Sequence, residues 1–183
     1  MNICIVDGNP STGTGGLQSF LEGLVGGLTA GGTSVEEIRL RDLEMRYCTG
    51  CFGCWVKSPG ECVFKDDSAG ICSQVINSDL TLFASPVIMG FPSALLKKAH
   101  DRLLPLIHPY IEFVQGECHH RARYSRYPLF GLLLEKQSDT DQEDLDLVTE
   151  IYGRLALNFK SSLALSKTTE TSPQEVCDEI NSI

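Results

Sequence analysis

The sequence lacks the features that would place this chain in a membrane, on a nucleic acid or outside the cell. No apolar run approaches the roughly 20 residues needed to cross a bilayer, and no basic segment followed by an apolar stretch marks a signal peptide. Lysine and arginine number 15 against 24 aspartate and glutamate residues, and the resulting net charge of −9 repels nucleic-acid phosphates. We therefore expect a cytoplasmic protein with neither a membrane nor a nucleic-acid partner.

The length of the chain makes covalent cross-links unnecessary. A chain of 183 residues buries most of its apolar surface within one domain, so disulfides are not needed as struts. We expect residues 1–183 to form a single domain, with a cysteine loop at residues 47–65 and an excursion at residues 103–127. In a reducing compartment, the eight cysteines are better explained by metal binding or redox chemistry than by disulfides.

Four of the thiols fall in one short stretch with the spacing C-x2-C-x2-C-x7-C, namely Cys48, Cys51, Cys54 and Cys62. Two-residue gaps let successive sulfurs point at one centre, which is how a cubane iron-sulfur cluster is held. Structural zinc sites usually split their ligands into two separated pairs, so the spacing favours a [4Fe-4S] cluster over zinc. Two alternatives stay open: a closed zinc site, or unmetallated thiols of which a Cys-x-x-Cys pair cycles through a disulfide.

The N-terminal region reads as a strand, a glycine-rich turn and a helix. Residues 2–7 are a nearly continuous apolar run, typical of a strand buried on both faces of a parallel sheet, and apolar residues then recur at helical spacing. The turn of residues 8–16 leads into the helix, whose first amides point outward with the positive end of the dipole. A phosphate fits there, with Ser11, Thr12 and Thr14 as further hydroxyl donors.

Further buried runs predict strands at residues 34–40, 80–85, 129–134 and 162–166, with helices between them. In open sheets of this kind, ligands gather beyond the carboxyl ends of the strands, at the point where the strand order reverses. The glycine-rich turn and the cysteine loop each follow a strand at that edge. We therefore expect the two to form one electron-handling pocket.

The residues after the third strand resemble the signature of the NAD(P)H-dependent FMN reductases, through Ser85-Pro86-Val87, Gly90, Ser93-Ala94, Lys97 and Asp101-Arg102. The turn that opens with Gly8-Asn9-Pro10 resembles the phosphate loop of the same family. The four thiols followed by Asp66-Asp67 resemble the iron-sulfur flavoproteins of the flavodoxin-like superfamily. The three motifs occur in order over about residues 1–105, which makes a chance match improbable.

The resemblance implies an α/β, flavodoxin-like three-layer sandwich, with a five-stranded parallel sheet in the order 2-1-3-4-5 and FMN at the switch point. It also implies an oxidoreductase that passes electrons between a reduced donor, such as NAD(P)H or a ferredoxin-like carrier, and a small acceptor. A homodimer or homotetramer is implied as well, with the excursion as a candidate contact. The implied cofactor-binding residues are Asn9, Ser11, Thr12, Gly15 and Gly16 around the phosphate, and Ser85, Pro86, Val87, Ile88, Met89 and Gly90 along the ring.

The chain departs from the family pattern at three places. Ser11 stands where the family has arginine, Gly15-Gly16 where it has Asn-Thr, and Ile88 where an aromatic residue is common. A charge-assisted phosphate contact is lost, which predicts weak FMN binding or a remodelled site. A second hypothesis therefore stays open, a non-enzymatic flavodoxin-like protein whose cysteine loop binds metal or senses redox state.

The sequence assigns no catalytic side chain. Flavin chemistry needs position and electrostatics from the protein rather than an acid-base triad. The candidate proton donors are His108, His119 and His120.

Overall fold

The structure is a computed structural model that describes residues 1–13 and 15–183. The core of the protein is a parallel sheet. Its strands run in the order β2-β1-β3-β7-β8, the predicted order of five parallel strands. A short sixth strand, β4 (Phe91–Pro92), pairs antiparallel with the end of β3 and was not predicted. The parallel strands are β1 (Asn2–Asp7), β2 (Ser34–Arg39), β3 (Leu80–Ile88), β7 (Leu129–Glu135) and β8 (Leu163–Thr168).

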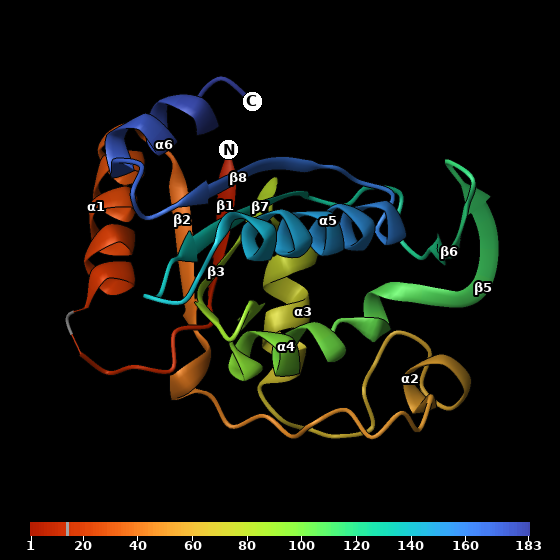
Figure 1. Cartoon of the computed structure of the whole chain (residues 1–183). Helices are drawn as coiled ribbons and strands as arrows, with labels where there is room; N and C mark the ends of the chain where they lie inside the picture. The colour runs from red at the N-terminus through yellow and green to blue at the C-terminus, as the bar shows by residue number, and fades with distance from the viewer. Residues whose placement is uncertain (14) are drawn as a thin grey trace.

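Helices cover both faces of this sheet and complete the predicted three-layer sandwich (Figure 1). Helices α1 (Gly16–Ala30) and α6 (Pro173–Ile180) pack together on one face. Helices α3 (Ser68–Asn77), α4 (Ala94–Asp101) and α5 (Gln142–Asn158) cover the other. Within the part of the chain that the structure describes, no helix is both long and apolar enough to cross a membrane.

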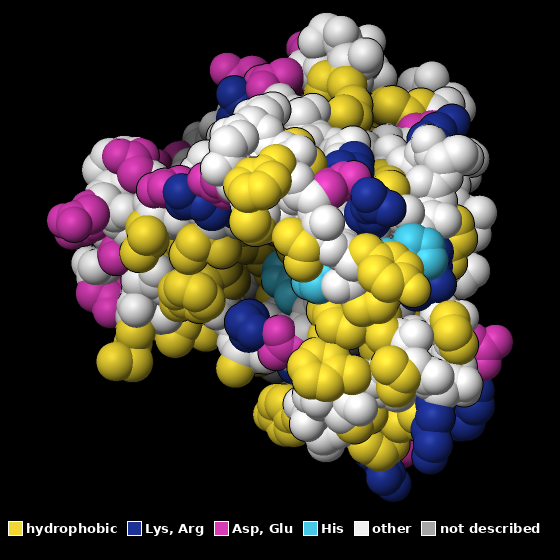
Figure 2. All heavy atoms as spheres, turned by 90° about the vertical axis from the view of Figure 1, so that its right-hand side faces the viewer, with side chains coloured by type: hydrophobic (Ala, Val, Ile, Leu, Met, Phe, Trp, Pro, Cys, Tyr) yellow, Lys and Arg dark blue, Asp and Glu magenta, His cyan; other side chains and the backbone are white. Residues whose placement is uncertain are grey.

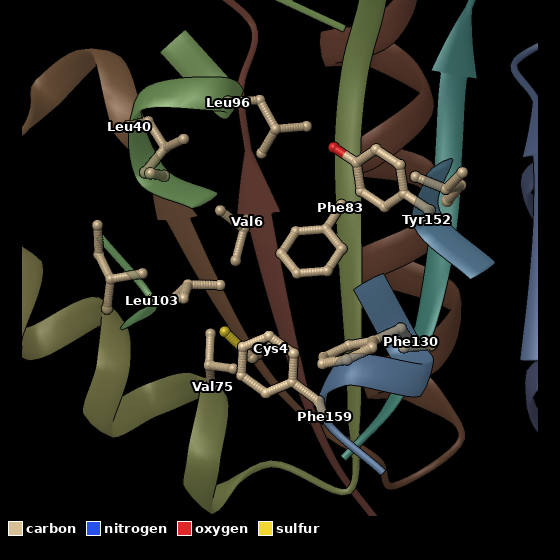
Figure 3. Close-up of a cluster of buried hydrophobic side chains, with 14 of the residues drawn as sticks. Cys4, Val6, Leu40, Val75, Phe83, Leu96, Leu103, Phe130, Tyr152 and Phe159 are labelled. Atoms are coloured by element: carbon tan, nitrogen blue, oxygen red, sulfur yellow. The ribbon is translucent and has the colours of Figure 1, made fainter. Parts of the chain in front are cut away.

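The buried residues of the strands alternate between the two faces of the sheet. Ile3 and Ile5 pack against α1 and α6, whereas Cys4 and Val6 belong to the cluster under α3, α4 and α5. Figure 3 shows this second cluster, in which the ring of Phe83 lies between those of Phe130 and Tyr152 at centroid distances of 5.4 and 5.5 Å. Burial raises the pKa of the Cys4 thiol to about 12, so this cysteine is an inert core residue, as expected.

The excursion folds into a β-hairpin that stands apart from the main sheet. Strands β5 (Ile107–Val114) and β6 (Glu117–Ala122) pair antiparallel after the short 3-10 helix η2 (Leu104–Leu106). They lie at the right of Figure 1, beyond the end of α5. The hairpin is attached there by the amide of His120, which donates to Oδ1 of Asn158, and by Lys160, which donates to the carbonyl of His120.

Candidate functional site

The carboxyl ends of β1 and β3 lie side by side where the strand order reverses. Asp7 at the end of β1 pairs in register with Ala84 of β3. Ser93, at the start of α4, joins the segments that follow: its amide donates to Oγ of Ser85 at 2.8 Å, and its hydroxyl donates to the carbonyl of Gly8 at 2.5 Å. A Cβ on Gly8 would lie 2.5 Å from Cβ of Leu96, so only glycine permits this close packing. The opening turn and residues 85–90 thus form one unit at the switch point.

A buried polar network supports the opening turn from below. The fully buried carboxylate of Asp7 accepts a hydrogen bond from the amide of Asn9 at 2.8 Å and pairs with Arg41 at 2.5 Å. Arg41 comes from the 3-10 helix η1 (Leu40–Asp42) and also donates to Gln18 of α1 at 2.9 Å. Burial raises the pKa of Asp7 more than the hydrogen bonds from Asn9 and Arg41 lower it. Sequence reasoning missed this network, for which the available signal was an acidic residue ending an apolar strand.

The residues predicted to surround a phosphate lie along this turn. The buried side chain of Asn9 accepts a hydrogen bond from the amide of Ser11 at 3.0 Å, which shapes the turn. Ser11, Thr12, Gly15 and Gly16 are exposed at its tip, and Thr14 lies outside the described residues.

Helix α1 starts beside the turn without a side-chain cap from its N-cap residue, Gly15. The amide of Leu17 donates instead to a carboxylate oxygen of Glu135, at the end of β7, over 2.8 Å. A helix N-terminus suits an anion, and here one of its amides already holds a negatively charged side chain. The turn as it stands therefore fits a flavin phosphate poorly.

Residues 85–90, which are predicted to lie along the flavin ring and are called the ring-edge segment below, end in a tight turn. Met89 and Gly90, with φ of 51° and 75°, connect β3 to β4, a geometry that glycine adopts readily. Pro86 and Val87 are buried, whereas Ile88 is 43% exposed and Met89 is 89% exposed. The exposed tip offers an apolar surface next to the switch point.

A buried ion pair closes the base of the cysteine loop. Arg102, which is 2% exposed, binds Asp66 at 2.9 Å and donates to the carbonyl of Arg46 at 2.6 Å. Asp66 also accepts from the amide of Arg46 at 3.0 Å, so the residues that flank the loop are tied together. Burial on its own would raise the pKa of Asp66, but hydrogen bonds from Ser68, Arg46 and Arg102 outweigh it and hold this pKa at about 2.

The four clustered thiols are neighbours on this loop without converging on one point. Burial raises the pKa of Cys54, and the nearby thiols of Cys62, Cys48 and Cys51 raise it further. Hydrogen bonds from the amide of Gly53 and the hydroxyl of Thr49 lower the pKa of Cys51. Among residues 1–13 and 15–183, no group of three or more histidine, cysteine, aspartate or glutamate side chains is arranged to hold a metal ion. The donor set suits a cluster, but its sulfurs are not gathered around one.

Trp55, in the short helix α2 (Gly53–Val56), fastens the cysteine loop to the hairpin. Its indole N–H donates to the carbonyls of Leu104 and Ile107 at 3.1 and 3.0 Å. Its ring lies 5.3 Å from that of Phe52 and 4.9 Å from that of His120. Figure 2 shows this side of the molecule, where histidines lie among hydrophobic side chains. The candidate proton donors are all hairpin residues and accompany the thiols rather than the opening turn.

The opening turn and the cysteine loop both lie at the carboxyl-end edge of the sheet, but at opposite ends of that edge. In Figure 1 the turn before α1 is at the left and α2 is at the right, with α4 between them. A cavity of about 680 Å³ borders the loop, lined by Cys62, Cys72 and Tyr124 among others and by none of the described residues of the turn. One chain therefore does not bring the thiols next to the turn, contrary to the expectation of a single pocket.

Comparison with known proteins places these features in a family. The sequence model of the NADPH-dependent FMN reductase family matches residues 1–115. An iron-sulfur flavoprotein of Archaeoglobus fulgidus is 35% identical over 94 residues, 51% of this chain and 42% of the relative. An iron-sulfur flavoprotein of Methanocaldococcus jannaschii is 39% identical over 75 residues, 41% of this chain and 38% of the relative. The matched region thus spans less than half of either relative.

Solved structures share the fold at low sequence identity. An azoreductase from Bacillus anthracis superposes with a TM-score of 0.70 at 11% identity, covering 100% of both chains. An NAD(P)H:quinone oxidoreductase from Methanothermobacter marburgensis gives a TM-score of 0.63 at 17% identity, covering 99% of this chain and 93% of that one. These similarities support the flavodoxin-like architecture.

Proposed function

This chain belongs to the NADPH-dependent FMN reductase family, and from that premise we propose that it is an FMN-dependent oxidoreductase of the iron-sulfur flavoprotein type. It would pass electrons between a reduced donor, such as NAD(P)H or a ferredoxin-like carrier, and a small acceptor. The observation that carries the proposal is the pair of hydrogen bonds from Ser93, which join Gly8 of the turn to Ser85 of the ring-edge segment. These bonds hold together, at the switch point of the sheet, the two segments that we propose to bind the flavin.

Bound flavin supplies the redox chemistry in this proposal, and the protein supplies position and dryness. Asn9 shapes the turn at one end of the site, and the exposed side chains of Ile88 and Met89 provide an apolar surface at the other. The buried Asp7–Arg41 pair keeps the turn rigid beneath them. The fit is good along the ring-edge segment and poor at the phosphate end, where Glu135 takes the amide of Leu17.

The cysteine loop is the proposed site of a [4Fe-4S] cluster, with Cys48, Cys51, Cys54 and Cys62 as ligands. Its ends are held by Arg102 and its middle by Trp55, so the thiols would close on a cluster within a loop that is already attached to the rest of the protein. The relatives from Archaeoglobus fulgidus and Methanocaldococcus jannaschii are iron-sulfur flavoproteins, which supports this choice over zinc.

An oligomer would bring the two separated parts of the edge together. The β5–β6 hairpin carries three large hydrophobic residues that are 53% to 80% exposed, Tyr110, Ile111 and Phe113. Large exposed apolar side chains gathered on one strand are typical of a contact between proteins. We propose a homodimer or homotetramer in which the hairpin lies at a subunit contact and the thiols of one copy approach the turn of another.

The absorbance spectrum of protein purified without oxygen tests the proposal. We expect flavin bands together with a broad brown shoulder that dithionite bleaches. Cys51→Ser should remove the shoulder and leave the flavin bands. The matched control is Cys118→Ser, which changes an exposed cysteine of β6 outside the loop and should leave both features. Loss of the shoulder in the control, or its survival in Cys51→Ser, would count against the ligand assignment.

The second candidate is a non-enzymatic flavodoxin-like protein whose cysteine loop binds metal or senses redox state. The observation that favours it is the carboxylate of Glu135 at the helix start, where a flavin phosphate would bind. A colourless protein, with bound zinc or with no metal, would support this candidate and exclude the first.

A further inference from the structure

Glu135 caps helix α1 from a distant part of the chain. It is the last residue of β7, and its side chain reaches the amide of Leu17, which lies 118 residues earlier in the sequence. Gly15, the N-cap residue, has no side chain that could accept this hydrogen bond. The first turn of α1 contains no acidic residue of its own, so Glu135 supplies the negative charge that favours a helix start.

Gly16 and Glu135 depend on each other sterically. A Cβ on Gly16 would lie 2.5 Å from the same carboxylate oxygen that accepts the hydrogen bond from Leu17. Any larger residue at position 16 would displace the carboxylate from the helix start. The absence of a side chain at Gly16 therefore leaves the room that the carboxylate of Glu135 occupies.

Glu135 also contacts both halves of the proposed flavin site. In the sheet it pairs in register with Pro86, a buried residue of the ring-edge segment, while its side chain turns toward the phosphate end. Two cations that could otherwise neutralise Glu135 pair with other carboxylates. Arg41 beneath the turn pairs with Asp7, and Lys136 pairs with Glu170.

We propose that Glu135 sets the selectivity of this site between phosphorylated and unphosphorylated flavins. The amide of Leu17 cannot donate to a carboxylate and to a phosphate at once, and the two anions would repel each other at the helix start. FMN must displace the side chain of Glu135, whereas riboflavin, which has no phosphate, leaves it in place. Wild-type protein therefore discriminates little between the two flavins. The inference rests on the proposed flavin site and adds the residue that decides which flavin fills it.

The test compares dissociation constants for FMN and riboflavin, measured separately by quenching of flavin fluorescence on protein freed of flavin. Glu135→Gln keeps the shape of the side chain and removes its charge, and Glu135→Ala clears the amide altogether. We expect both variants to bind FMN at least about tenfold more tightly than wild type and to bind riboflavin within about twofold of it. Glu150→Gln is the matched control, because it removes one charge from an exposed residue in the middle of α5, and both constants should be unchanged.

The possible failures are distinct. If wild type and variants bind both flavins but the ratio of the two constants does not change, or if FMN binds more weakly to the variants, the role of Glu135 is overturned and the flavin site stands. If neither flavin binds to any of the proteins, the proposed function itself fails and the inference falls with it. Circular dichroism of each variant establishes that a lost signal does not come from unfolding.

Discussion

The opening turn and the cysteine loop occupy the two ends of the same sheet edge, and they satisfy their polar groups in opposite ways. Around the turn, the protein supplies its own partners, since Asp7 binds Arg41 and Glu135 binds the helix start. Around the loop, the frame is fixed by Arg102 and Trp55, while the thiols that it carries have not converged.

This contrast indicates where an external group would bring the larger gain. At the turn, a phosphate has to compete with a carboxylate that already holds the helix amide. At the loop, burial and, after it, the neighbouring thiols raise the pKa of Cys54 and so disfavour its charged form, and a bound cluster would neutralise that charge. The loop is the end that gains more from its cofactor, and the following predictions test that difference.

Arg102→Met should have the largest effect. The change leaves the carboxylate of Asp66 and the carbonyl of Arg46 without their buried cation, which costs about 3–5 kcal/mol in the free energy of unfolding. Urea denaturation measures this loss. Arg154→Met, at an exposed ion pair with Glu150, is the control and should cost less than about 1 kcal/mol. Equal losses in the two variants would mean that the base of the loop is not held by Arg102.

The Asp66–Arg102 pair should also make the loop sensitive to acid. The pKa of Asp66 is about 2 in the folded protein, below the ordinary value of about 3.9 in an unfolded chain. Its stabilising contribution is therefore complete above the ordinary value and is lost as the pH falls toward 2. The difference in unfolding free energy between wild type and Asp66→Asn should shrink over this range. A difference that stays constant from neutral pH down to pH 2 would contradict the assignment.

Asp7→Asn tests the other end of the edge. The amide keeps a hydrogen-bond acceptor for Asn9 but removes the charge that Arg41 pairs with, at an expected cost of about 1–2 kcal/mol. Because the turn and the loop lie apart, the rate at which a thiol reagent modifies the four clustered cysteines should not change. A faster modification would show that the two ends are coupled within one chain.

Trp55→Phe should have the smallest effect on stability. It removes the indole N–H that donates to Leu104 and Ile107 and keeps the aromatic ring, so we expect a loss of about 1 kcal/mol. The loop should nevertheless open more often, and thiol modification should become several-fold faster. An unchanged modification rate would mean that the hairpin does not restrain the loop.

Local patterns predicted the sheet well. The strands follow from apolar runs such as residues 2–7, and the turn of residues 8–16 follows from its glycines, because both patterns are contained in a few adjacent residues. The four thiols were visible for the same reason. The β5–β6 hairpin was not predicted, since β5 contains Pro109 and β6 consists mostly of polar and charged residues, neither of which is typical of a strand.

The tertiary contacts that shape the candidate site could not be predicted from the sequence. Arg102 was noticed as part of a signature, but its pairing with Asp66 depends on how α4 packs on the loop. Glu135 reads as the polar end of a strand, and its hydrogen bond to Leu17 follows from the sheet order rather than from any local pattern. A parallel sheet brings together residues that are distant in sequence, which is why the frame was predictable and these contacts were not.

Quantification of iron, acid-labile sulfide, zinc and flavin in one sample purified without oxygen tests the central claim most directly. The account predicts iron and sulfide in equal amounts, about four of each per chain, together with flavin that is lost more readily than iron on gel filtration. Zinc in place of iron, or tightly held flavin with no sulfide, would contradict it.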